Sequence, residues 1–297
     1  MKKKPKKHNR SRAGTPVNQK HKDRLFRFVF QDKKYLLSLY NAINKTDYQN
    51  PEDLTITTLE DAVFLGMKND LSFVIGATMN LYEHQSTQNA NMPLRGLIYF
   101  AGLYQSYVNQ NGYNLYGSQK IRLPFPNYVV FYNGESTAPD ETDLFLSDCF
   151  PQTDRKLVPC LECKARMLNI NLGHNRELME KCKRLWEYAE FISQIRANLK
   201  NGLELSDAIR TAMNYCQSKG ILSDILTRCQ TEVLNMLLTE YNEKETMDYI
   251  RKEEREITRE RINKLFLLLL NDNRSNDLRR AAEDVNFQEE LFRFYGI

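Results

Sequence analysis

Residues 70–85 form the stretch Asp-Leu-Ser-Phe-Val-Ile-Gly-Ala-Thr-Met-Asn-Leu-Tyr-Glu-His-Gln. Two short runs rich in apolar side chains flank the dipeptide Gly76-Ala77, a pattern that favours two strands joined by a tight turn. Around such a turn the residue numbers of two facing partners add up to about 153. Asp70 is therefore expected to lie opposite Glu83. The stretch therefore predicts an antiparallel hairpin that ends in two facing carboxylates.

These facing acids are the first candidate site. Directly paired residues have Cβ atoms about 4.5–5.5 Å apart, where two like charges are destabilising unless something compensates them. Because side chains alternate along a strand, Glu83 and Gln85 share one face and His84 points to the other, packed on the back of the sheet. The two carboxylates and the Gln85 amide converge on one spot, and such hard oxygen ligands suit Mg²⁺ or Mn²⁺, so we predict a cation site here. A solvated polar hairpin face is the alternative.

A helix is predicted directly after the hairpin, over residues 91–108. Asn91 suits the N-cap position and Pro93 the first turn. Arg95 and Tyr99 are four residues apart, so they share the helix face that begins next to the carboxylates. A guanidinium in that place suits bidentate contact with a phosphate, with Tyr99 beside it. A salt bridge to a neighbouring acid is the alternative for Arg95.

The rest of the chain shows strand-like patterns in its first half and helical periodicity towards its end. This order predicts an α/β fold: a mixed sheet flanked by helices, with a helical C-terminal region. The predicted strands are 54–59, 62–67, 122–126, 127–132 and 165–172. The predicted helices are 23–43 (one or two helices), 175–199, 204–218, 222–242, 245–270 and 277–294.

The net charge of +4 hides an uneven distribution. Nine of the 42 Lys and Arg residues fall within 1–22, whereas all 38 acids lie beyond that segment. Residues 1–22 cannot bury enough apolar surface to offset the entropy of ordering, so we predict a disordered basic arm that attracts the phosphate backbone. The remaining residues have a net charge of about −5. We divide the chain into this arm, an α/β domain over 23–200 and a helical region over 201–297.

Several protein classes are disfavoured by the same composition. The longest apolar run, 265–270, is far short of the roughly 20 residues that a membrane-spanning helix needs. No apolar stretch follows the basic residues as in a secretory signal, so we predict a cytoplasmic protein with reduced cysteines. Cys160 and Cys163 have the spacing of a zinc knuckle, but no second pair follows at zinc-site spacing. The zinc signal is therefore weak.

Five blocks of the sequence resemble one known family, the Rpn-type recombination-promoting nucleases, also described as transposases of the PD-(D/E)xK nuclease superfamily. The likeness covers roughly residues 23–245. The matching blocks are 68–73, 83–87, 91–95, 128–134 and 169–175, the last of which contains His174. For His174 itself, a capping or loop hydrogen bond is favoured over substrate contact.

The resemblance implies a restriction-endonuclease-like core and Mg²⁺-dependent hydrolysis of DNA phosphodiester bonds during recombination or transposition. Asp70 takes the place of the first acid of the family motif, Glu83 that of the second acid, and Gln85 that of the lysine. A neutral amide orients a water molecule but supplies no positive charge. An acid from an upstream helix often completes the metal site of this superfamily, and Asp23 is the candidate.

Other functions stay open at this point. A non-catalytic DNA-binding or assembly protein derived from such a nuclease would also have these acids, with Gln85 as a sign of lost activity. A basic-armed RNA binder is a further alternative, supported by the arm alone. A homodimer is expected by analogy, since cleavage of both strands needs two sites.

Overall fold

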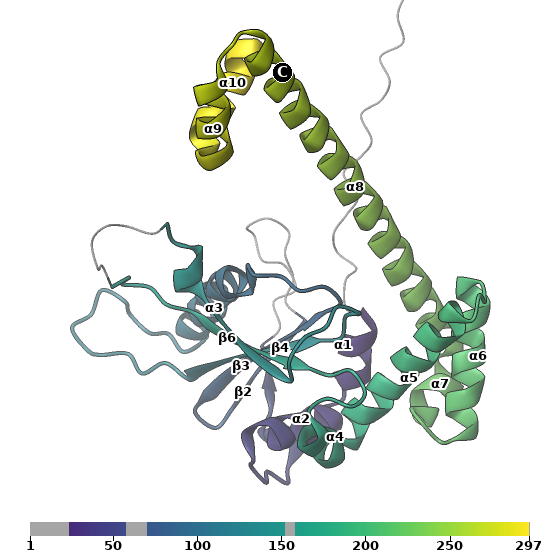
Figure 1. The fold of residues 1–297 in the computed structure, drawn as a ribbon. Helices are drawn as coiled ribbons and strands as arrows, with labels where there is room; N and C mark the ends of the chain where they lie inside the picture. The colour runs from purple at the N-terminus through teal and green to yellow at the C-terminus, as the bar shows by residue number, and fades with distance from the viewer. Residues whose placement is uncertain (1–23, 58–69, 152–157, 297) are drawn as a thin grey trace, which may run out of the picture. The chain divides into compact units, whose positions relative to one another are not determined.

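The computed structural model describes residues 24–57, 70–151 and 158–296 (Figure 1). The basic arm, Asp23 and the predicted strand 62–67 lie outside these ranges. The hairpin, the helix after it and the later strands, on which the candidate site depends, are all described.

The described strands form one mixed sheet in the order β1-β2-β3-β4-β6-β5. The first three are antiparallel neighbours, β3, β4 and β6 are parallel, and β5 is antiparallel to β6. Leu71 pairs with Tyr82 and Ile75 with Thr78, so the predicted hairpin register is confirmed. The strand bounds are β1 (Thr55–Ile56), β2 (Leu71–Ile75), β3 (Thr78–Gln85), β4 (Phe125–Tyr132), β5 (Glu141–Phe145) and β6 (Lys164–Asn169).

Helices cover both faces of this sheet (Figure 1). Helix α3 (Met92–Gln110) lies on one face, over a buried apolar cluster from β3, β4 and β6. The opposite face packs against α1 (Arg24–Phe30) and α5 (Lys183–Lys200), where Phe26 and Tyr188 meet the ring of His84. Helix α2 (Lys33–Asn44) also packs on the sheet, where the ring of Tyr40 contacts that of Phe73. The coarse prediction of a mixed sheet flanked by helices is therefore confirmed.

A glycine sets the distance between α3 and the sheet. A Cβ atom at Gly96 would overlap the ring of Tyr128 on β4, so the helix reaches this depth only because the position has no side chain. Helix α3 begins where the sequence predicts it, with Asn91 at the N-cap and Pro93 in the first turn, although no side-chain capping bond forms. The close approach brings Arg95 down to the end of β3.

Strand β5 was not predicted from the sequence. Its residues Glu-Thr-Asp-Leu-Phe are mostly polar, and they alternate between exposed and half-buried at the edge of the sheet. A polar edge strand resists pairing with other chains, but it lacks the apolar alternation by which strands are recognised. The predicted strand 127–132 is part of one strand, β4, which begins at Phe125 and includes Pro126, whereas residues 122–124 of the predicted strand 122–126 lie outside any strand. β6 pairs with β4 only from Val129 onward, so Pro126 lies where β4 has a single neighbour.

Four predicted helix boundaries are wrong, and one of them lies inside 222–242, where Cys229 separates α7 (Ser223–Arg228) from α8 (Gln230–Asn271). The helix 175–199 is two helices, α4 (Arg176–Lys181) and α5, separated at Cys182. The helix 277–294 is also two, α9 (Ser275–Glu283) and α10 (Val285–Tyr295), because the Asp284 carboxylate caps α10 by accepting the backbone N–H groups of Asn286 and Phe287. The predicted gap near residue 243 is absent, since α8 (Gln230–Asn271) is continuous. Single-residue breaks do not disturb the 3.6-residue periodicity, so sequence periodicity does not reveal them.

The chain divides into two compact units, Met1–Leu238 and Thr239–Ile297. Helices α6 (Leu205–Ser218) and α7 (Ser223–Arg228) belong to the first, and α6 packs on α5. The second has its own small core, formed by α9 (Ser275–Glu283), α10 (Val285–Tyr295) and the end of α8. That core contains Leu265, Leu269, Ala281, Leu291 and Phe292. The sequence placed a boundary earlier, after residue 200.

Among the helices of the described ranges, none has both the length and the apolar content that a bilayer crossing requires.

Candidate active site

The hairpin brings the two predicted acids together in the interior. Asp70 directly precedes β2 and Glu83 lies near the end of β3; they are 8% and 0% exposed. The Asp70 backbone N–H donates to Glu83 Oε1 over 3.2 Å. Asp70 Oδ2 in turn accepts the backbone N–H of His84 at 2.7 Å. Each acid is thus fixed by the backbone of the opposite strand, and the predicted juxtaposition holds.

Helix α3 adds a basic group to these acids. Arg95 Nη2 donates to Glu83 Oε2 at 2.7 Å and to the Tyr99 hydroxyl oxygen at 3.2 Å. Glu83 lies on the β3 face that faces α3, as do Met79 and Leu81. Arg95 and Tyr99 reach it from successive turns, so the predicted sharing of one helix face by these two residues is confirmed. The sequence left a phosphate contact and a salt bridge open for Arg95, and in this structure the guanidinium pairs with Glu83.

The charges of this cluster affect one another. Burial is the largest single effect on the Arg95 guanidinium and lowers its pKa, but the Glu83 carboxylate, Tyr99 and Tyr128 together outweigh burial, so the pKa is raised. Burial, reinforced by the Glu83 charge, raises the pKa of the Tyr99 hydroxyl to about 12. Near neutral pH Arg95 therefore stays cationic and Tyr99 stays neutral. Tyr99 is a dipole beside the ion pair, not a second charge.

Gln85 ends β3 on the same face as Glu83 and is half-buried. Its backbone C=O accepts the N–H of Asn133, which ties β3 to the loop after β4. Within the described ranges the side-chain amide has no recorded hydrogen bond. The position fits the predicted role of orienting a water.

His84 points to the opposite face, as predicted. Its ring is 2% exposed and stacks on Phe26 with centroids 5.1 Å apart. The Tyr188 hydroxyl lies 3.0 Å from its Nε2. Aromatic packing therefore fixes the ring behind the sheet, while the backbone N–H of the same residue holds Asp70. His84 contributes to the candidate site through its main chain.

The donor set suits a hard divalent cation only in part. Asp70 and Glu83 offer carboxylate oxygens, the ligand type that Mg²⁺ prefers. Within the described ranges no group of three or more His, Cys, Asp or Glu side chains is placed to hold one metal ion. Asp23, the predicted additional ligand, lies outside those ranges. The two acids would thus hold a cation together with the His84 carbonyl, Gln85 or water.

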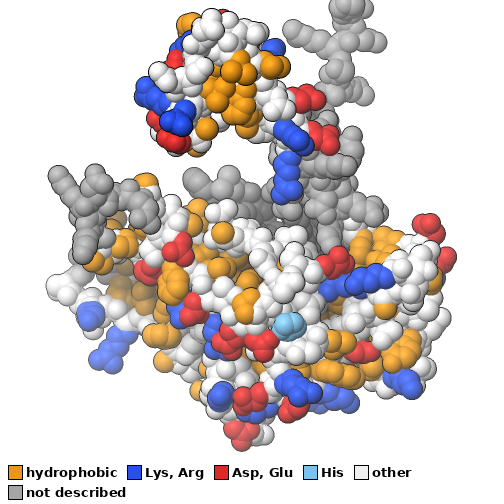
Figure 2. Space-filling model, in the orientation of Figure 1, with side chains coloured by type: hydrophobic (Ala, Val, Ile, Leu, Met, Phe, Trp, Pro, Cys, Tyr) orange, Lys and Arg blue, Asp and Glu red, His pale blue; other side chains and the backbone are white. Residues whose placement is uncertain are grey.

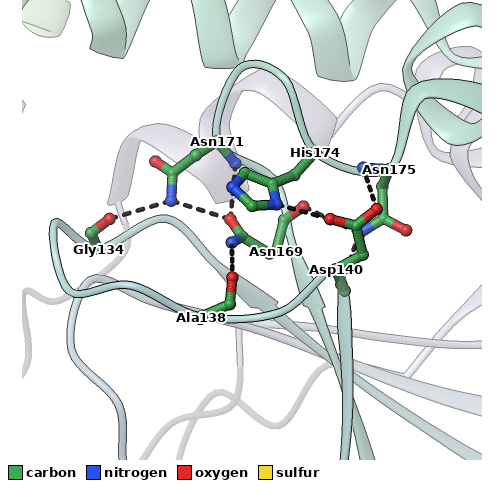
Figure 3. A network of polar contacts seen from close by, with 7 residues as sticks. All are labelled: Gly134, Ala138, Asp140, Asn169, Asn171, His174 and Asn175. Atoms are coloured by element: carbon green, nitrogen blue, oxygen red, sulfur yellow. Dashed lines mark hydrogen bonds and ion pairs between the residues drawn. The ribbon is translucent and has the colours of Figure 1, made fainter.

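A polar network beside this site joins the loops that follow β4 and β6 (Figure 3). His174 Nδ1 lies 2.6 Å from Asp140 Oδ1, and the Asn175 side-chain amide donates to the Asp140 and Asn169 carbonyl oxygens. The His174 contact, followed by the Asn175 backbone N–H, lowers the pKa of Asp140. The loop hydrogen-bonding role predicted for His174 is confirmed. Asp140 was missed because its partner lies 34 residues away along the chain.

Cys160 and Cys163, the pair with zinc-knuckle spacing, lie in different environments. Cys160 is exposed, whereas Cys163 packs against the apolar cluster under α3. Burial raises the pKa of the Cys163 thiol to about 11. Because the thiolate is the reactive form, we expect iodoacetamide at pH 8 to alkylate Cys160 at least about tenfold faster than Cys163. Peptide mapping by mass spectrometry measures both rates, and Cys149, also exposed, is the internal control. Equal protection of Cys160 and Cys163 that a chelator removes would instead indicate bound zinc.

Comparison with family models, curated proteins and solved structures finds no match to this chain.

Proposed function

We propose that this chain is a Mg²⁺- or Mn²⁺-dependent endonuclease that hydrolyses DNA phosphodiester bonds. The observation that supports this best is the buried cluster of Asp70, Glu83 and Arg95 at the end of one hairpin. Burying charged groups is unfavourable unless they are paired, and such clusters concentrate at functional sites. Asp70 and Glu83 would also take the places of the two acids in the motif of the family that the sequence resembles.

Each residue has a distinct task in this proposal. A bound cation would supply a water of lowered pKa and neutralise charge on the phosphate. Asp70 and Glu83 would provide its carboxylate ligands, in a place already ordered by the backbone N–H groups of Asp70 and His84. The half-buried amide of Gln85 would hold the attacking water for in-line displacement. No protein nucleophile is required.

Arg95 has two possible partners at different stages. Without substrate its guanidinium stabilises the buried Glu83 charge. With DNA bound, a non-bridging phosphate oxygen would compete for the same donors, and a guanidinium suits that contact. Tyr99 hydrogen-bonds to Nη2 and would keep the guanidinium at the site during the exchange. Arg95 would thus move from stabilising the empty site to holding the scissile phosphate.

The proposal includes the finer expectations of the sequence. These are a restriction-endonuclease-like core, a role in recombination or transposition, a cytoplasmic location and a homodimer.

Figure 2 shows acidic and basic side chains interspersed over one face of the described first unit. Such a mixed surface gives little net attraction to DNA, so we assign the sequence-independent affinity mainly to the basic arm.

Nicking of supercoiled plasmid DNA tests the proposal. We expect Mg²⁺- or Mn²⁺-dependent nicking by the parent chain and a loss of about 100-fold or more in Asp70→Asn and in Glu83→Gln, because each substitution removes a charged ligand. Glu177→Gln is the matched control, since this exposed acid is paired with Lys181 away from the site. Gel densitometry over time gives the rates.

Equal rates in the parent, the two site variants and the control would contradict the assignment. Rates that are unchanged by a chelator would contradict metal dependence. Circular dichroism of each variant separates a lost site from a lost fold.

A second function is favoured by two observations. Gln85 stands where the motif has lysine, and Arg95 occupies an oxygen of Glu83 that a cation needs. Both features fit a non-catalytic DNA-binding or assembly protein derived from such a nuclease. Calorimetric titration with Mn²⁺ separates the two: binding that Asp70→Asn abolishes supports the enzyme, and no binding together with no nicking supports the derived protein.

A further inference from the structure

A cavity of about 540 Å³ lies where α4 and α5 meet the loop after β6. This volume is in the range of small-molecule pockets in proteins. It is separate from the Asp70–Glu83 cluster, with which it shares no residue. Its lining combines apolar and charged side chains: Leu172, Gly173, His174, Arg176, Met179, Glu180, Lys183 and Trp186.

Trp186 gives the cavity an aromatic wall. It is the only tryptophan in the chain and is 37% exposed, a large value for so apolar a ring. Met179, which is 7% exposed, provides the buried floor. A half-exposed indole over an apolar floor is suited to stacking with a flat ring of a ligand.

Two cations stand at the same cavity. Lys183 lies three residues before Trp186 and so shares its helix face. The Lys183 side chain is 82% exposed, with its nearest carboxylate oxygen, from Glu187, 3.7 Å away. Arg176 forms no ion pair with any acid in the described ranges. Both cations are therefore accessible to an anionic ligand, which fits a phosphate beside the stacked ring.

The polar groups of the lining are compatible with such a ligand. His174 is held by Asp140 at 2.6 Å and shapes the wall. Among the described residues Glu180 is the one acid that lines the cavity, so a phosphate would lie on the side of Arg176 and Lys183, and this carboxylate would accept an N–H of the base, such as N3–H of thymine. The cavity also follows the carboxyl end of β6, and that end of parallel strands is where α/β sheets most often bind ligands.

We propose that this cavity binds one nucleotide of single-stranded DNA, with the base stacked on Trp186 and its phosphate between Arg176 and Lys183. The choice of DNA rests on the proposed function, whereas the stacking site rests on the cavity itself. At this site the chain would hold an unpaired strand by its base, independently of sequence. The basic arm, in contrast, would attract the phosphates of any nucleic acid.

Intrinsic fluorescence tests the proposal directly, because all tryptophan emission comes from Trp186. We titrate the full chain, in EDTA to prevent cleavage, with an oligothymidylate of about twelve nucleotides and with an abasic strand of equal length and charge. The expected result is saturable quenching by oligothymidylate and little quenching by the abasic strand. Equal quenching by the two strands, or none by either, would overturn the proposal.

Anisotropy of a labelled oligothymidylate gives the affinities of the variants. We expect Trp186→Ala to bind about tenfold more weakly and Arg176→Ala several-fold more weakly, the latter still showing quenching. Tyr116→Ala is the matched control, since this fully exposed aromatic residue lies on another loop and its loss should leave the affinity unchanged. Unchanged affinity in Trp186→Ala, with native circular dichroism, contradicts the stacking site.

Base-dependent quenching without nicking would refute only the endonuclease, and nicking without quenching would refute only this site.

Discussion

Replacing Arg95 by alanine is expected to lower the free energy of unfolding by about 3–5 kcal/mol in the absence of divalent cations. The reason is the burial of its partner: Glu83 is 0% exposed, and Arg95 Nη2 lies 2.7 Å from its Oε2. Without the guanidinium, a carboxylate stays in the interior with much less compensation. Urea denaturation followed by Trp186 fluorescence measures the loss, since this residue lies in the same compact unit.

Lys181→Ala is the control for this experiment. It also removes one cation from an ion pair of 2.7 Å, but both side chains of that pair are largely exposed. The expected change is about 0.5 kcal/mol or less. If Arg95→Ala were no more destabilising than Lys181→Ala, the buried pair would not support the fold as described.

The Arg95 variant also makes the metal site measurable. If Glu83 is a ligand, Mn²⁺ should stabilise Arg95→Ala more than the parent chain, because the cation and the guanidinium compete for the same carboxylate. The double variant Glu83→Gln/Arg95→Met removes both charges, so it should recover part of the stability and lose the response to Mn²⁺. An equal response to Mn²⁺ in all three chains would place the cation elsewhere.

Phe26→Ala is expected to be about as destabilising, at roughly 3–5 kcal/mol. The Phe26 ring is fully buried and contacts four aromatic rings, those of Phe30, His84, Phe131 and Tyr188, at centroid distances of 4.8, 5.1, 5.0 and 5.4 Å. Its loss leaves a cavity where α1, α5 and the sheet meet. The same urea denaturation gives the free energy.

Phe125→Ala is the matched control, because this phenylalanine begins β4 and is 72% exposed. A change within about 0.5 kcal/mol is expected there. Similar losses in both variants would mean that the aromatic cluster behind His84 is not the main core of this face. In Phe26→Ala the backbone of His84 should also become less ordered. Because the backbone N–H of His84 holds Asp70, slower nicking is expected in this variant.

Local chemistry explains why much of the candidate site could be predicted. The Gly76-Ala77 turn and the period of two along a strand depend on adjacent residues, and they fixed the register that sets Asp70 beside Glu83. The same alternation separated His84 from Glu83 and Gln85. The N-cap at Asn91 and the four-residue spacing put Arg95 and Tyr99 on one face of the next helix.

The contacts that the sequence did not reveal are those between distant segments. Arg95 pairs with Glu83 because α3 lies close to the sheet. That close approach requires a glycine at position 96, where a Cβ atom would overlap the ring of Tyr128 on β4. The link between Asp140 and His174 and the edge strand β5 likewise require β6 to be in place.

The sequence by itself determined the hairpin, its register and the faces of its side chains, because turn chemistry and strand periodicity act over a few residues. Only the tertiary structure decided which charge balances Glu83 and that Trp186 borders a cavity, because both depend on the packing of elements far apart in the chain.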